Sequence, residues 1–113
     1  MSEGFPLLPS GHIVFSPPEE FDLATVPDVE SELRHLLELH RWVVIDLSEV
    51  TFIDSSGLSA LIWARQESLK LGGEVVVVGP SRRTLRLLEI TKLSDVFPLY
   101  DSLDDVPPAS AAG

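Results

Sequence analysis

The sequence contains no cysteine, so it offers neither a disulfide framework nor a thiolate metal site. Basic residues are scarce: 8 Lys and Arg stand against 18 Asp and Glu, which gives a net charge of −10. This charge opposes binding to a phosphate backbone, and we expect no nucleic-acid partner. Nothing in the composition requires an oxidising compartment, and we expect the protein in the cytoplasm.

Long apolar runs are missing as well. No run is long enough to cross a bilayer, and the opening residues MSEGFPLLPS lack the basic start and the apolar stretch of a signal peptide. We therefore expect no membrane partner. The glycine spacings of a Walker phosphate loop and of a hydrolase nucleophile elbow are also absent. No metal or cofactor is expected, and we interpret His12, His35 and His40 as surface or helix-end residues.

The strands and helices that can be predicted describe one α/β domain. Two β-branched runs, residues 42–47 and 74–79, have no polar alternation, as in strands covered on both faces. A helix predicted from Gly57 to about Leu71 joins them, which favours a right-handed parallel crossover. Two short strands, residues 5–8 and 12–15, are predicted to form an N-terminal hairpin. The sheet is then mixed and mainly parallel, with helices packed against it.

Two further helices are predicted from their start signals. One begins near Val26, where Thr25 and Asp28 have the spacing of a capping box, and the other follows Ser81 as N-cap. Pro98 suits a short edge strand. We expect the domain to span residues 1–106 and the tail, residues 107–113, to be disordered.

The stretch TFIDSSGL, which joins a predicted strand to the helix from Gly57, holds an acid, two hydroxyls and a glycine. A helical wheel places Ser56, Ser59, Trp63 and Lys70 opposite an apolar side of Leu58, Leu61, Ile62 and Leu69. Ser56 is therefore predicted to point outward, where free helix N–H groups would stabilise a phosphate, while Gly57 allows another backbone to approach. The competing interpretation is that Asp54, Ser55 or Ser56 only caps the helix.

The chain resembles the STAS domain family, and within it the single-domain anti-sigma factor antagonists of bacteria. The resemblance runs from about His12 to Val106 and is carried by EFDLATVPDVESEL, VVIDLSEVTFIDSSGLSAL, GGEVVVVGPS and LRLLEITKLSDVFPLYDSLDDV. Asp-Ser-Ser-Gly-Leu between a buried strand and a helix is its most specific part. Two positions depart from the family pattern: residues 18–22 lack a glycine, and Lys92 follows Thr91 where the family often has glycine.

The resemblance implies a phosphorylation switch. The serine before the glycine, here Ser56, would be phosphorylated by an anti-sigma factor that is itself a serine kinase. The unphosphorylated protein would bind that kinase and release a sigma factor, and a metal-dependent serine phosphatase would reset the cycle. Partner contacts would come from Asp22, Asp54, Ser55, Ser56, Gly57, Ser59 and Trp63. The protein would then act as substrate and ligand and not as an enzyme, as a monomer or weak dimer.

The sequence also allows alternative interpretations. The same fold could serve as a constitutive STAS subunit of a transporter or stress-signalling scaffold, in which Ser56 is structural; a serine hydrolase that uses Ser56 ranks third. Trp63 is either a partner anchor or a side chain packed on its own protein. Arg82, Arg83 and Arg86 form either a solvated helix face or a contact for an acidic partner or a nucleotide phosphate.

Overall fold

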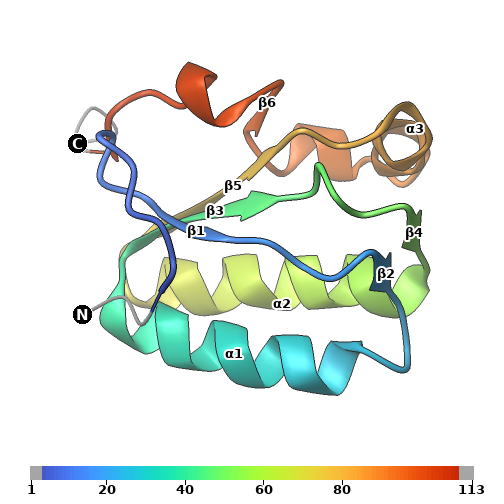
Figure 1. The fold of residues 1–113 in the computed structure, drawn as a ribbon, viewed down its shortest axis with the longest axis horizontal. Coiled ribbons are helices and arrows are strands. Elements are labelled where there is room, and N and C mark those ends of the chain that lie inside the picture. The colour runs from blue at the N-terminus through green and yellow to red at the C-terminus, as the bar shows by residue number, and fades with distance from the viewer. Residues whose placement is uncertain (1–3, 110–113) are drawn as a thin grey trace.

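The computed structural model describes residues 4–109, which form a parallel sheet flanked by helices (Figure 1). In chain order the elements are β1 (Ile13–Phe15), β2 (Glu20–Phe21), α1 (Val26–Leu39), β3 (Trp42–Asp46), β4 (Phe52–Ile53), α2 (Ser55–Lys70), β5 (Glu74–Val78), α3 (Arg82–Ile90) and β6 (Leu99–Tyr100). Two 3-10 turns follow the last helix, η1 (Leu93–Asp95) and η2 (Leu103–Asp105). No helix within the described residues is long and apolar enough to span a membrane.

The main sheet has the strand order β1-β3-β5-β6, and each neighbouring pair is parallel. The predicted crossover from β3 through α2 to β5 is confirmed. Strands β2 and β4 form a separate short parallel pair, with Phe21 opposite Ile53. The predicted hairpin is reduced to one antiparallel bridge between Leu7 and Ile13. Pro6 and Pro9 flank that bridge without N–H groups, which prevents a longer ladder.

Both faces of the sheet are covered, which explains the apolar runs without alternation. Helices α1 and α2 lie along one face (Figure 1), and the side chains of β1, β3 and β5 on that face form the larger core with them. On the other face, Val14, Val44 and Val76 pack with Val106 and the half-buried Leu103 of the C-terminal segment. Each strand therefore contributes apolar residues in both directions.

The buried stripe of α2 differs from the predicted one. Small residues form most of it: the buried positions are Gly57, Ala60, Leu61, Ala64 and Ser68. Leu69, which was expected on the buried side, is 51% exposed. Because α2 packs against both β5 and α1, small side chains allow close approach on two sides, and Leu61 is the one large residue in the buried stripe.

The helix starts confirm one predicted cap and correct another. The Ser81 hydroxyl accepts the Thr84 N–H at 3.1 Å and caps α3, as predicted. Thr25 makes no side-chain cap bond at α1; its hydroxyl donates to the Glu20 carbonyl at 2.8 Å and accepts the Asp22 N–H at 3.0 Å. Thr25 thus fastens the β2–α1 loop. Lys92 adopts the left-handed conformation, with φ of 67°, where the family often has glycine.

Two further expectations are corrected at the N-terminal turn. His12 is buried, not a surface residue: its Nδ1 lies 2.9 Å from the Ser10 hydroxyl and its Nε2 3.5 Å from Glu74 Oε1. Ala109, within the tail expected to be disordered, is buried and donates its N–H to the Ser10 carbonyl at 2.8 Å. That bond fixes residues 107–109 against the turn, whereas residues 110–113 lie outside the described part of the chain.

Candidate functional site

Asp54 is the N-cap of α2. Its backbone is extended, with φ of −111° and ψ of −173°, and its Oδ1 accepts the N–H groups of Ser56 at 2.9 Å and Gly57 at 3.1 Å. Of the three residues that could have capped this helix, the acid takes the role. The helix start therefore needs neither serine hydroxyl.

The hydroxyls of Ser55 and Ser56 are left without protein partners. Within residues 4–109, neither Oγ atom takes part in a hydrogen bond. Ser55 is exposed and Ser56 is half-buried. Ser59, one turn further along α2, is also exposed. The beginning of α2 thus presents hydroxyl groups that the fold does not use.

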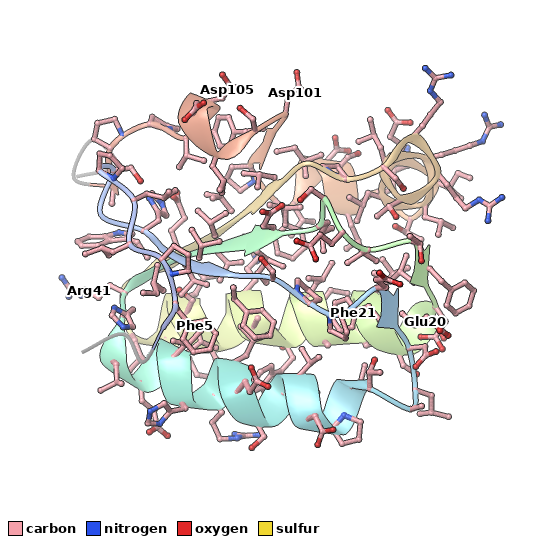
Figure 2. All side chains as sticks on the ribbon, viewed as in Figure 1. Phe5, Glu20, Phe21, Arg41, Asp101 and Asp105 are labelled. Carbon is pink, nitrogen blue, oxygen red and sulfur yellow. The ribbon has the colours of Figure 1, made fainter. Side chains whose placement is uncertain are left out.

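The other Asp54 carboxylate oxygen ties a second segment to the same place. Oδ2 accepts the Leu23 N–H at 3.2 Å, and the Asp54 N–H donates to the Phe21 carbonyl at 3.4 Å. Together with the β2–β4 pair, these bonds hold the loop after β2 beside the start of α2. Figure 2 shows Glu20 and Phe21 at this end of α2.

Gly57 is required by this close approach. A Cβ atom there would lie 2.5 Å from the Phe21 carbonyl oxygen and 2.7 Å from Ile53 Cγ1. These separations are too short for any side chain, so the β2 backbone can pass α2 only because the residue is glycine. The predicted role of Gly57, room for a second backbone, is confirmed.

Asp22 lies in this loop, where its carboxylate has a structural task. Oδ1 accepts the N–H groups of Ala24 at 3.0 Å and Thr25 at 3.3 Å, the pattern of a side chain that shapes a turn. Because the next residue, Leu23, is bonded to Asp54, the turn that Asp22 shapes belongs to the same surface as the serines. The missing family glycine does not prevent this loop from forming.

The expected phosphate cradle at the helix start is wrong in one respect. Asp54 already occupies the N–H groups of Ser56 and Gly57, and the Leu58 N–H donates to the Asp54 carbonyl at 3.1 Å. A phosphate on Ser56 would therefore meet the Asp54 carboxylate at the helix end, where among the first-turn N–H groups of the described chain only that of Ser55 is without a partner. The helix dipole remains favourable, but the nearest side-chain charge is repulsive.

Trp63 is two turns further along α2 than Ser56 and packs against its own protein. It is half-buried against the core, and the Arg34 guanidinium of α1 lies 4.9 Å from the centre of its ring. The two side chains line a shallow hollow of about 100 Å³ with Leu37, Glu38, Glu67 and Leu71. Packing on its own protein, the second of the two interpretations, describes its position here.

Two exposed apolar residues at the site were missed from the sequence. Leu23 is 73% exposed and Phe52 is 48% exposed, and both belong to the segments tied to Asp54. The sequence pattern that could have indicated them is an apolar residue within a short polar segment, Leu23 in EEFDLAT and Phe52 in EVTFID. Phe52 is exposed because the two-residue strand β4 presents it outward and Ile53 inward, whereas Leu23 lies in the loop after β2.

Two cavities larger than the hollow beside Trp63 lie elsewhere. One of about 530 Å³ opens at the amino ends of β3 and β5, lined by Arg41, Trp42, Arg65 and Glu74 among others. Another of about 360 Å³ is acidic, with Asp46, Asp101 and Asp104 in its wall. Within residues 4–109 there is no group of three or more His, Cys, Asp or Glu that could hold a metal ion.

The arrangement defines a class of protein: a small α/β domain that displays unbonded serines and exposed apolar side chains where a helix begins. Residues 8–106 match the family model of the STAS domain, and the chain belongs to that family. It is 38% identical over 80 residues to the anti-sigma-B factor antagonist of Listeria monocytogenes, an alignment that covers 69% of each protein.

Solved structures share this fold. An anti-sigma factor antagonist from Mycobacterium paratuberculosis is 33% identical, with a TM-score of 0.71 over 95% of this chain and 97% of that one. The Bacillus cell fate determinant SpoIIAA in its phosphorylated form superposes with a TM-score of 0.70 at 14% identity, over 89% of this chain and 92% of the other. The latter likeness concerns the fold alone.

Proposed function

We propose that this protein is an anti-sigma factor antagonist switched by phosphorylation of Ser56. In the unphosphorylated form it binds an anti-sigma factor that is a serine kinase, and the sigma factor held by that kinase is released. Phosphorylation of Ser56 by the bound kinase ends the interaction, and a metal-dependent serine phosphatase restores it. The protein is a ligand and a substrate in this cycle.

One observation carries the proposal: Asp54 caps α2 and leaves the Ser55 and Ser56 hydroxyls without protein hydrogen bonds within residues 4–109. A serine that serves only as a cap would accept an N–H at the helix start. Here that bond belongs to the acid. The relatives named anti-sigma factor antagonists, which match most of the chain, support the identity of the partner.

The exposed residues around the serines suit a protein partner. Leu23 and Phe52 supply apolar contact area, and the ring of Phe52 is a side chain typical of interface centres. A partner that buries these two residues also covers the serines, since Leu23 and Ser56 are both bonded to Asp54. Unphosphorylated hydroxyls can be buried in such a contact because they can find hydrogen-bond partners across it.

Phosphorylation would disrupt this contact through charge. A phosphoserine adds about 1.5 to 2 negative charges at neutral pH. On Ser56 this charge would join the Asp54 and Asp22 carboxylates, and burying it beside Leu23 and Phe52 would be unfavourable. The fold itself can tolerate the group because the start of α2 remains at the surface. Both hydroxyls are unbonded, so the hydrogen bonds do not distinguish the two serines. Ser56 is proposed as the phosphorylated residue because of the resemblance to the STAS family.

The proposal is tested by measuring the affinity of four variants for the cognate anti-sigma factor by calorimetry. Ser56→Ala is expected to bind as tightly as the wild type, and Ser56→Asp at least tenfold more weakly, because one desolvated charge opposes association by more than about 1.4 kcal/mol. Ser55→Ala and Ser55→Asp are the matched controls. Equal affinity of Ser56→Ala and Ser56→Asp would contradict the switch and favour a constitutive subunit.

A further inference from the structure

Helix α3 begins with a cluster of positive charge. Arg82, Arg83 and Arg86 are all exposed, and within residues 4–109 none of their guanidinium groups forms an ion pair or a hydrogen bond. They account for three of the eight Lys and Arg in a chain of net charge −10. Figure 2 shows nitrogen-tipped side chains extending from α3 into solvent. The helix thus carries free cations on an otherwise acidic protein.

Folding gives no reason for this placement. The first turn of a helix is the positive end of its dipole, so the charges of Arg82 and Arg83 there are unfavourable. Arg82 and Arg86 are four residues apart, and Arg83 and Arg86 are three apart, so like charges also repel along one side of the helix. The Ser81 cap holds the helix start in spite of them.

An apolar side chain accompanies the arginines. Ile90 is 67% exposed and follows Arg86 by four residues and Arg83 by seven, which places all three on one side of α3. Exposed arginines beside an exposed aliphatic residue are typical of a protein interface, in which arginine is enriched. An aliphatic side chain such as Ile90 would contribute nothing to the binding of a free anion, which favours a protein partner.

The α3 surface and the serine site lie at the same end of the molecule. Strands β3 and β5 are parallel neighbours with Asp46 opposite Val78, so their carboxyl ends share one edge of the sheet. Beyond that edge the chain enters β4 and α2 on one side and α3 on the other. Figure 1 shows α3, β4 and the beginning of α2 together at this end. One partner can therefore reach both.

We propose that Arg83 and Arg86 dock on an acidic surface of the protein that binds the Ser56 site. Ile90 packs between side chains of that same partner. The inference rests on the proposed function for the identity of that partner. The arginines orient the encounter, since an acidic patch on the partner is attracted to α3 and repelled by the rest of this chain. Such contacts raise association rates and depend on salt.

The test compares two double charge reversals that change the net charge equally. Arg83→Glu with Arg86→Glu removes the α3 patch, and Arg41→Glu with Lys70→Glu is the control, because both of these residues are exposed and Arg41 lies at the opposite end of the molecule (Figure 2). Binding to the cognate anti-sigma factor is measured by surface plasmon resonance. We expect the α3 reversal to weaken binding about tenfold more than the control at low salt, with a gap that narrows at high salt.

The outcomes separate the two proposals. Equal affinities of the two reversals would overturn the docking surface, whereas an absence of binding by the wild type would overturn the proposed function and this inference with it. Glutamate at position 83 is favourable in the first turn of α3, and position 86 is exposed, so the α3 reversal is expected to fold. Arg83→Gln with Arg86→Gln provides a neutral second variant, and its affinity should fall between those of the wild type and the reversal. An affinity equal to the wild type's would also count against the proposal.

Discussion

Asp54 is the residue on which the site depends. One of its carboxylate oxygens binds two N–H groups at the start of α2, and the other binds Leu23 in the loop after β2. A single side chain therefore sets the direction of the helix and the position of the neighbouring loop. Because the acid fulfils both tasks, the two serines that follow are available for another use.

Replacement of this acid should lower the stability of the whole domain. Asp54→Ala removes a cap and leaves the Leu23 N–H without its partner, and we expect a loss of about 1 to 2 kcal/mol in the free energy of unfolding. Urea denaturation followed by circular dichroism measures it. Asp28→Ala, an exposed acid in the first turn of α1, is the control and should change stability by less than about 0.5 kcal/mol. Equal effects of the two substitutions would contradict the role given to Asp54.

The sequence indicated that Asp54, the serines and Gly57 stand at a helix start, but not what each of them does there. An acid, two hydroxyls and a glycine mark a helix start from composition alone, but which of the three polar residues caps it depends on the backbone angles at Asp54. The exposure of Leu23 and Phe52 was not predictable in the same way. The exposure of Phe52 follows from the pairing of β2 with β4, two strands of two residues each that lie far apart in sequence, and Leu23 is held in the loop after β2 by its bond to Asp54.

The size of the buried side chains of α2 is set by the two elements packed against it, the sheet and α1. The buried residues Gly57, Ala60, Ala64 and Ser68 allow the sheet and α1 to approach. A helical wheel assigned the buried side to leucines because it ranks residues by hydrophobicity and ignores the distance between elements. Where two elements pack closely, the smallest side chains mark the contact, and Leu69 is left 51% exposed at its margin.

Gly57→Ala tests that description of α2. Alanine favours a helix over glycine by about 1 kcal/mol, so an open position would gain stability. Here the added Cβ would collide with the Phe21 carbonyl and Ile53, and we expect a loss of about 1 to 3 kcal/mol in the free energy of unfolding. Thermal denaturation of this variant is compared with that of Ser59→Ala, at an exposed position of the same helix. A gain in stability at residue 57 would refute the close contact with β2.

At the scale of the molecule, the parallel order of β1, β3, β5 and β6 places the beginnings of α2 and α3 at one edge of the sheet. The α/β class and the crossover could be predicted because β3 and β5 are apolar without alternation. The segment that covers the second face of these strands could not be predicted. It is provided by Val106 and the turn η2, whose sequence, rich in aspartate, predicts only an exposed helical turn.

The excess of acids should make stability depend on salt. A net charge of −10 on 113 residues repels itself, and added salt screens that repulsion. We expect the free energy of unfolding in urea to rise by about 1 kcal/mol between about 20 and 300 mM sodium chloride.

Asp101, Asp104 and Asp105 are exposed, and Asp101 and Asp105 project from the C-terminal segment in Figure 2. Their triple replacement by asparagine should reduce the salt effect, and an undiminished effect would show that it arises elsewhere.

Phosphosite mapping by mass spectrometry, after incubation of the purified protein with ATP and an extract of its native cell, decides whether Ser56 is the switch. The phosphorylation switch predicts phosphate on Ser56, none on Ser55, and loss of the modification in Ser56→Ala. An unmodified Ser56 in an extract that phosphorylates a control antagonist, or phosphate on Ser55 alone, would contradict it.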